Sequence, residues 1–291
     1  MSKEAWGRWG VGDERGAFNS ADAAAVKRAV RLVRDGRVFG LAQPLSPRTP
    51  LPAQRHRVAH LMDQDGGDYA AGAERPGGYQ VADDTLFMPV HVGTHIDALC
   101  HAWYDDQLYN GFPGDGTRSA TAATRCGVDK LGPIVTRGVL FDFVRHRGAP
   151  LGAGATIAAA DLVAVAASSG IAIDAGDAVL IRTGWVETML GDPQAYFGAE
   201  PGIDESGALW LAERGVSLVG ADNFAIEVIP FAAGKVFPVH QRLIRDFGIP
   251  LLEGLVLAAL GATGAAEFLF ATTPLPIVGG TGSPVCPLAV I

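Results

Sequence analysis

The sequence predicts an α/β fold, because helix-like segments alternate with short apolar runs along its second half. Residues 177–184 (DAVLIRTG) and 216–222 (VSLVGAD) are apolar runs of strand length, typical of strands that are covered on both faces. Residues 205–214 lie between them and form a predicted helix that Gly215 ends. Strands joined through helices usually pair in parallel, so the alternation by itself indicates a buried parallel sheet.

The neighbouring segments extend this pattern. Thr156 is predicted to cap a helix that ends at Gly170, and residues 132–144 form a further apolar strand. Residues 239–248 are predicted to form a short helix, followed by an apolar strand over residues 249–260. The first half is less regular, with strand-like or extended stretches at residues 36–46, 55–63 and 84–99.

The composition excludes several classes of partner. A chain of 291 residues without repeats or a Pro/Ser-rich linker is expected to form a single domain over residues 1–291. Its net charge of −8 and the lack of any basic run argue against nucleic acid as a partner, because counterion release requires clustered Lys and Arg. We therefore expect the partner to be a small-molecule substrate.

The same inspection argues against a membrane or secreted protein. No segment reaches the roughly 18 apolar residues of a membrane helix, and the longest candidate, residues 249–260, is interrupted by Glu253 and Gly254. The N-terminus lacks the charged-then-apolar order of a signal peptide. The three cysteines show no CxxC spacing, so neither a disulfide framework nor a zinc knuckle is indicated. We expect a cytoplasmic location.

One long loop is predicted next to the most polar motif of the chain. Residues 63–79 (DQDGGDYAAGAERPGGY) contain five glycines, one proline and charges of both signs. Loops of this length within a compact domain are usually functional or mobile. Because the loop precedes a histidine-rich stretch, we expect it to act as a lid or a wall of an active site.

The histidine-rich stretch HVGTHIDALCH, residues 91–101, predicts a metal site. Proline, glycine and β-branched residues disfavour a helix here. In an extended chain, alternate side chains share one face, so His91, Gly93, His95 and Asp97 would lie together, with the glycine leaving a gap between the imidazoles. Two imidazoles and a carboxylate suit Zn²⁺, Mn²⁺ or Fe²⁺. His101 follows closely enough to act as a proton acceptor.

A complete metal site requires ligands from elsewhere in the chain. Glu253 is a single acid within an apolar segment, where an unpaired carboxylate is costly. It either forms an ion pair with Arg242 or Arg245, or it completes the metal site together with His240. The residues themselves leave both alternatives open.

The motif HVGTHIDALCH closely resembles the H-x-G-T-H-x-D-x-x-x-H signature of the putative cyclase family, which includes bacterial kynurenine formamidases and isatin hydrolases. Residues 9–19 and 239–257 also resemble conserved segments of that family. The resemblance implies an α/β swivelling domain with a mixed, barrel-like sheet flanked by helices, assembled as a homodimer or homotetramer. It also implies one or two divalent ions, Zn²⁺ or Mn²⁺. The implied metal ligands are His91, His95, Asp97, His240 and Glu253, and the implied catalytic histidine is His101.

Two departures from the family pattern concern the substrate. Leu99 stands where many members have proline, and residues 221–228 (ADNFAIEV) keep Asp222 but lack the usual serine. The candidate substrate-binding residues are Trp103, Tyr104, Tyr109, Asp222 and Phe224. Each aromatic residue among them could equally belong to the core.

The resemblance implies a hydrolase that uses metal-activated water to cleave an amide, cyclic amide or lactone of a small aromatic substrate. One alternative is a polyketide-type cyclase that uses the same metal to polarise a carbonyl group. A second alternative is a metal-binding module without catalytic activity.

Overall fold

A curled, mixed sheet of nine strands forms the centre of the computed structural model, which describes residues 5–291. Along the sheet the strands are β1 (Val38–Gly40), β15 (Leu288–Val290), β13 (Glu267–Thr272), β7 (Ile134–Asp142), β9 (Ala178–Arg182), β11 (Leu218–Ala221), β12 (Leu251–Glu253), β4 (His95–Asp97) and β14 (Gly282–Pro284). Strands β7, β9, β11 and β12 pair in parallel, and every other neighbouring pair is antiparallel. The α/β class and the mixed sheet are therefore confirmed, whereas a wholly parallel sheet is wrong.

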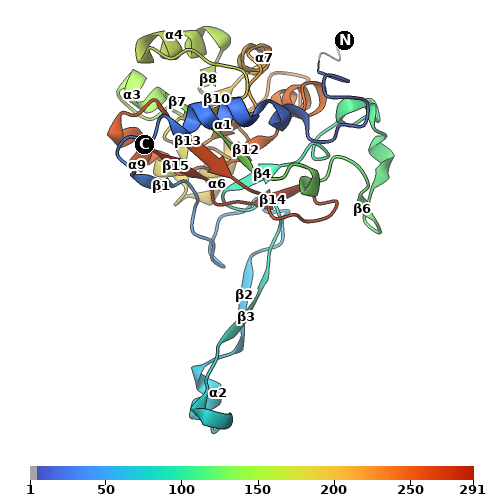
Figure 1. Cartoon of the computed structure of the whole chain (residues 1–291), viewed down its shortest axis with the longest axis vertical. Helices are drawn as coiled ribbons and strands as arrows, with labels where there is room; N and C mark the ends of the chain where they lie inside the picture. Colours follow the sequence, from blue (N-terminus) through green and yellow to red (C-terminus); the bar gives the residue numbers. More distant parts are fainter. Residues whose placement is uncertain (1–4) are drawn as a thin grey trace.

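Helices flank this sheet (Figure 1). They are α1 (Ala23–Val30), α3 (Phe143–Arg147), α4 (Ala159–Ser169), α5 (Trp185–Met189), α6 (Pro193–Gly198), α7 (Glu205–Glu213), α8 (Pro238–His240) and α9 (Ala258–Thr263), with a π-helical turn at Gln241–Asp246. Two short strand pairs lie outside the sheet, β8 (Thr156–Ile157) with β10 (Gly202–Ile203) and β5 (Thr117–Arg118) with β6 (Ala122–Ala123). Within residues 5–291, no helix has the length and apolar character needed to cross a membrane.

The predicted alternation is present between β7 and β11, where α4 and α7 connect the parallel strands. Helix α4 ends where expected, because Gly170 adopts the left-handed conformation with φ of +66°. Its start differs from the prediction, since Thr156 belongs to β8 and the helix begins after Ala158. The Asp161 side chain instead accepts a hydrogen bond from the Ala158 N–H, 3.0 Å away, and so provides a partner for the N–H group that precedes the helix.

The apolar segment 249–260 is not one strand. Its strand β12 covers only Leu251–Glu253, because Gly254 turns the chain with φ of +65° and α9 begins at Ala258. Hydrophobicity alone could not distinguish the two elements, since both begin within the same apolar segment. The short strand nevertheless carries Glu253 at its carboxyl end, next to β4.

The predicted loop 63–79 lies at the tip of a projecting arm. Strands β2 (Ala59–Gln64) and β3 (Asp83–Phe87) form an antiparallel hairpin that extends away from the body, with α2 (Gly66–Ala70) at its end (Figure 1). A lid or wall formed by residues 63–79 over the site of the same chain is therefore wrong. The extended pairing of β2 with β3 carries the loop outward.

Candidate metal centre and adjoining cavity

Strand β4 brings the central ligands of the histidine motif together with β12. The register pairs His95 with Glu253 and Asp97 with Leu251. Directly opposed residues of an antiparallel pair project from the same face, so His95 and Glu253 meet. Their side chains approach to 3.2 Å between Nε2 of the histidine and Oε2 of the glutamate. Asp97 lies two residues from His95 and therefore projects from that face as well.

The remainder of the motif is not an extended strand, which corrects our interpretation of Gly93. Residue 93 has φ of +55°, so the chain turns between His91 and His95 instead of continuing as β-structure. A Cβ atom there would lie 2.9 Å from Leu45 Cδ2. Glycine is thus favoured by the positive φ of the backbone turn, and it does not serve to leave a gap between imidazoles.

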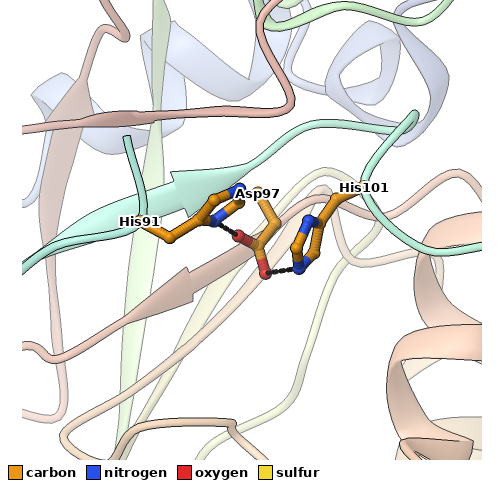
Figure 2. Close-up of side chains that lie close together, drawn as sticks. All are labelled: His91, Asp97 and His101. Atoms are coloured by element: carbon orange, nitrogen blue, oxygen red, sulfur yellow. Dashed lines mark ion pairs between the residues drawn. The ribbon is translucent and has the colours of Figure 1, made fainter. Parts of the chain in front are cut away.

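The turn places His91 and His101 on two sides of the Asp97 carboxylate (Figure 2). His91 Nδ1 lies 2.7 Å from Asp97 Oδ1, and His101 Nε2 lies 4.0 Å from Asp97 Oδ2. From the other direction, His240 Nε2 approaches Asp97 Oδ2 to 3.6 Å and Glu253 Oε1 to 3.2 Å. Asp97 is therefore shared by two groups of potential ligands, His91–Asp97–His101 and Asp97–His240–Glu253, within each of which the ligand atoms lie within 4.8 Å of one another.

These residues fit a metal ion, because their buried polar atoms lack other partners. In the described part of the chain, His91 Nδ1, His95 Nε2, both oxygens of Asp97 and Glu253 Oε1 are buried, and their polar contacts are with other members of this cluster. Buried polar groups are normally hydrogen-bonded, so such atoms facing one another call for a common ligand. Imidazole nitrogen and carboxylate oxygen are donors that suit Zn²⁺ and Mn²⁺. Arg242 and Arg245 pair with other carboxylates, which removes the ion-pair alternative for Glu253.

Three of the histidines, His91, His95 and His240, are oriented by a contact on the other ring nitrogen. His95 Nδ1 donates to the Gly93 carbonyl oxygen at 3.0 Å, and His240 Nδ1 donates to Glu227 Oε1 at 2.6 Å. His91 Nε2 lies 3.0 Å from Thr281 Oγ1. These contacts leave the opposite nitrogens directed at Asp97 and Glu253, as is typical for metal-binding histidines.

Sequence reasoning missed Glu227. It is a single acid within the apolar run AIEVI, the same signal that singled out Glu253. The side chain is buried and accepts hydrogen bonds from the backbone N–H groups of Val239 and His240, 3.1 Å away in each case, as well as from the imidazole. Glu227 therefore holds both the start of α8 and the ring of His240.

We expect Glu227→Gln to weaken metal binding about 10- to 100-fold, because an amide orients the His240 ring less firmly and makes it less basic. Competition with a chromogenic chelator measures the affinity. Glu267→Gln, an exposed carboxylate that pairs with Arg137, is the matched control and should bind metal like the wild type. Equal affinity in Glu227→Gln and the control would show that His240 does not depend on this carboxylate.

The charges of the centre follow from burial and from its neighbours. Burial alone would raise the pKa of Asp97, but His101 and His91 hold the pKa well below its usual range, so Asp97 is anionic. Burial lowers the pKa of His101 to about 4, despite the attraction of Asp97. The His101 imidazole is therefore neutral at neutral pH and able to accept a proton.

His95 and His240 behave differently from His101. Burial acts to lower the pKa of both, but Glu253 raises the pKa of His95, and Glu227 with Glu253 raises that of His240 well above the usual value. Both shifts favour the protonated form of the imidazole when no cation is bound. A cation that binds here must displace these protons.

A cavity of about 840 Å³ opens onto the centre. His101, His240 and Glu253 line it together with Phe197, Phe224 and Phe237. The volume is typical of small-molecule sites, and the walls are mainly apolar. Of the predicted substrate-binding residues, Phe224 lies here, packed edge-on against Phe197 with ring centroids 4.9 Å apart. Its position is set by Glu200, whose buried carboxylate accepts from the Phe224 and Ala225 N–H groups.

The three aromatic residues after His101 do not line this cavity. Tyr109 is fully buried in the core and donates its hydroxyl to Asp13, so its predicted substrate role is wrong. Tyr104 donates to Asp246 at 2.7 Å and stacks on the Arg245 guanidinium. The Trp103 indole covers Gly114, where a Cβ atom would lie 2.6 Å from Nε1. The chain turns away from the cavity directly after the motif and carries these rings with it.

Asp222 has a structural role, which corrects its prediction as a substrate-binding residue. It is fully buried and accepts hydrogen bonds from Thr183 N at 2.8 Å, Thr183 Oγ1 at 2.6 Å and Gly184 N at 2.7 Å. Burial raises the pKa of Asp222 to about 6, although these three donors oppose the rise. The carboxylate joins the ends of β9 and β11 and is not available to a ligand.

Asp222→Ala is accordingly expected to lower the free energy of unfolding by about 3 kcal/mol, because three buried donors lose their acceptor. Urea denaturation followed by circular dichroism measures the change, and Asp222→Asn, which keeps one acceptor oxygen, should lose less. An unchanged urea midpoint in Asp222→Ala would contradict the structural role.

The fold and the centre define a class of protein: an α/β protein whose buried His, Asp and Glu side chains converge beside a small-molecule cavity. A family model described as a putative cyclase matches residues 39–228, more than half of the chain. The chain belongs to this putative cyclase family, which confirms the resemblance seen in the histidine motif.

Three similar proteins extend this comparison. The chain is 31% identical over 201 residues to a protein named kynurenine formamidase from Salinibacter ruber, a match that covers 69% of this chain and 76% of that protein. It is 32% identical over 217 residues to a protein named isatin hydrolase from Roseibium aggregatum, covering 71% and 73%. A crystal structure described as a novel cyclase superposes with a TM-score of 0.91 at 37% identity, covering 98% of this chain and 99% of that one.

Proposed function

We propose that this protein is a metal-dependent hydrolase that cleaves a C–N bond in an amide or cyclic amide of a small aromatic substrate. The observation that carries the proposal is the convergence of buried donor atoms from His91, His95, Asp97 and Glu253 beside an aromatic-walled cavity. Two relatives at 31% and 32% identity carry the names of hydrolases, kynurenine formamidase and isatin hydrolase, which supports the reaction type.

The centre would hold one or two ions of Zn²⁺ or Mn²⁺. His91, His95, Asp97, His240 and Glu253 are the residues that would hold them, and Asp97 belongs to both groups of potential ligands. A divalent cation, when bound, supplies a Lewis acid that polarises a carbonyl group and lowers the pKa of water.

The side chains of the cavity would bind the substrate and transfer the proton. The aromatic walls, which include the edge-on pair Phe197 and Phe224, orient the substrate. His101 Nε2 accepts a proton from water as the oxygen attacks the carbonyl carbon, and it returns that proton to the departing nitrogen. A C–O bond forms, the C–N bond breaks, and the products are a carboxylic acid and an amine. No oxidant or further reactant is needed.

A panel of substrates tests this function. Protein freed of metal with a chelator is reconstituted with Zn²⁺ or Mn²⁺ and assayed with formanilide, isatin and an aryl lactone. We expect hydrolysis of formanilide or isatin that depends on stoichiometric metal. Metal binding without turnover of any member of the panel would contradict the proposal, and so would turnover of the lactone alone.

A further inference from the structure

Two arginines line the cavity on the side formed by the segment before the arm. Arg55 and Arg57 both contribute to its wall, which they share with residues 51–54 of the same segment. The Arg55 guanidinium also lies 5.7 Å from the centroid of the Phe224 ring. The cationic side of the cavity is therefore adjacent to its aromatic side.

These cations have no carboxylate partner within residues 5–291. Arg57 makes no hydrogen bond or ion pair there, and Arg55 donates only through Nη1, to the His91 carbonyl oxygen at 2.6 Å. Glu253 is the single acidic residue among those that line the cavity, and it faces His95 and His240. Some other arginines within the same residues, such as Arg137, Arg147 and Arg182, pair with carboxylates, and others, such as Arg48, do not, so Arg55 and Arg57 are distinguished by their place on the cavity wall.

We propose that Arg55 and Arg57 form an anion subsite, and that the substrate carries a carboxylate or similar anionic group on its aromatic portion. This inference rests on the proposed function and specifies its substrate class. Arg55 is half-buried and Arg57 is exposed at the cavity wall, and a guanidinium with free N–H groups binds a carboxylate through charge-assisted hydrogen bonds. The ring of such a substrate would lie against Phe224, with the reacting carbonyl group at His101.

The two arginines have separable roles. Arg55 also holds the backbone at His91, so its replacement would disturb the metal centre. Arg57 has no such contact, so Arg57→Ala tests the subsite alone. Arg57→Lys keeps the charge but loses the planar guanidinium group, so it should retain part of the preference for the anionic substrate. Arg48→Ala is the matched control, because Arg48 is an exposed arginine of the same segment that does not line the cavity.

The experiment compares 4-formamidobenzoate with formanilide, which differ by one carboxylate. In a para position the carboxylate is too far from the formamide to bind the same ion. We expect the wild type to prefer the anionic substrate, through a lower KM. The ratio of kcat/KM values, anionic over neutral, should fall about 10- to 100-fold in Arg57→Ala and stay at the wild-type value in Arg48→Ala.

A binding measurement separates this inference from the proposed function. Benzenesulfonate, an anion that ligates metals weakly, is titrated by calorimetry into wild-type and Arg57→Ala protein. We expect the variant to bind it at least tenfold more weakly. Hydrolysis of formanilide with equal ratios in wild type and Arg57→Ala would overturn the anion subsite and leave the hydrolase intact. Arginine-dependent binding of benzenesulfonate without any turnover would support the subsite and contradict the hydrolase.

Discussion

Asp97→Asn is expected to abolish metal binding and hydrolysis together. Asp97 is buried and lies between His91, His101 and His240, and it belongs to both groups of potential ligands. Loss of a residue that only supports a metal ligand costs about 10- to 100-fold in metal affinity, so loss of a ligand shared by both groups should cost more than about 100-fold. Metal content after dialysis and kcat/KM with formanilide measure the two effects.

A further readout shows whether the variant is folded. The wild type should gain thermal stability when Zn²⁺ or Mn²⁺ is added, because only the folded chain assembles the centre. Asp97→Asn should melt cooperatively but without this gain. Asp105→Asn, an exposed aspartate eight positions later, is the matched control and should behave as the wild type. Full metal content in Asp97→Asn would contradict the proposed centre.

His101→Ala is expected to lower kcat about 10²- to 10⁴-fold while the metal content stays unchanged, because the variant loses the proton acceptor and keeps the ligands. The physical basis is the lowered pKa of His101, which leaves the imidazole neutral, and its position on the wall of the cavity. Steady-state kinetics and elemental analysis of the same sample measure both quantities. Added imidazole should restore part of the rate.

The same experiment distinguishes a proton acceptor from a metal ligand, because a ring nitrogen of His101 lies within 4.8 Å of ligand atoms from His91 and Asp97. Loss of metal in His101→Ala would assign His101 as a ligand and would contradict the proton-transfer role. Full activity with metal retained would show that another group moves the proton. His146→Ala, an exposed histidine that contacts Ser168, is the control for loss of an imidazole.

The histidine motif predicted most residues of the metal centre, whereas the apolar segments predicted the fold less completely. His91, His95, Asp97 and His101 lie within eleven residues, so short-range chain geometry keeps them close whatever the conformation. The conformation itself was predicted incorrectly, because the chain turns at Gly93, and Thr94 beside this turn is hydrogen-bonded to Gln43 and Gly254, which are distant in the sequence. Turns that depend on tertiary contacts are not visible in hydrophobic periodicity.

The substrate-binding residues were the least predictable. Tyr109 and Asp222 are residue types that often bind ligands, yet both are satisfied within the core, by Asp13 and by residues 183–184. Arg55 and Arg57 had no motif to indicate them. Their role depends on which acidic residues are absent from their surroundings, and only the folded chain defines those surroundings.

The sequence by itself determined the α/β class, the family and the histidine motif, because these depend on local composition and on residues that are close in the chain. Only the tertiary structure decided how the centre is completed. The register of β4 against β12 places Glu253 opposite His95, and Glu227 holds the ring of His240. His95 and Glu253 are more than a hundred positions apart in the chain, and Glu227 and His240 belong to different elements. Such pairings are determined by the packing of the whole sheet, which no local pattern encodes.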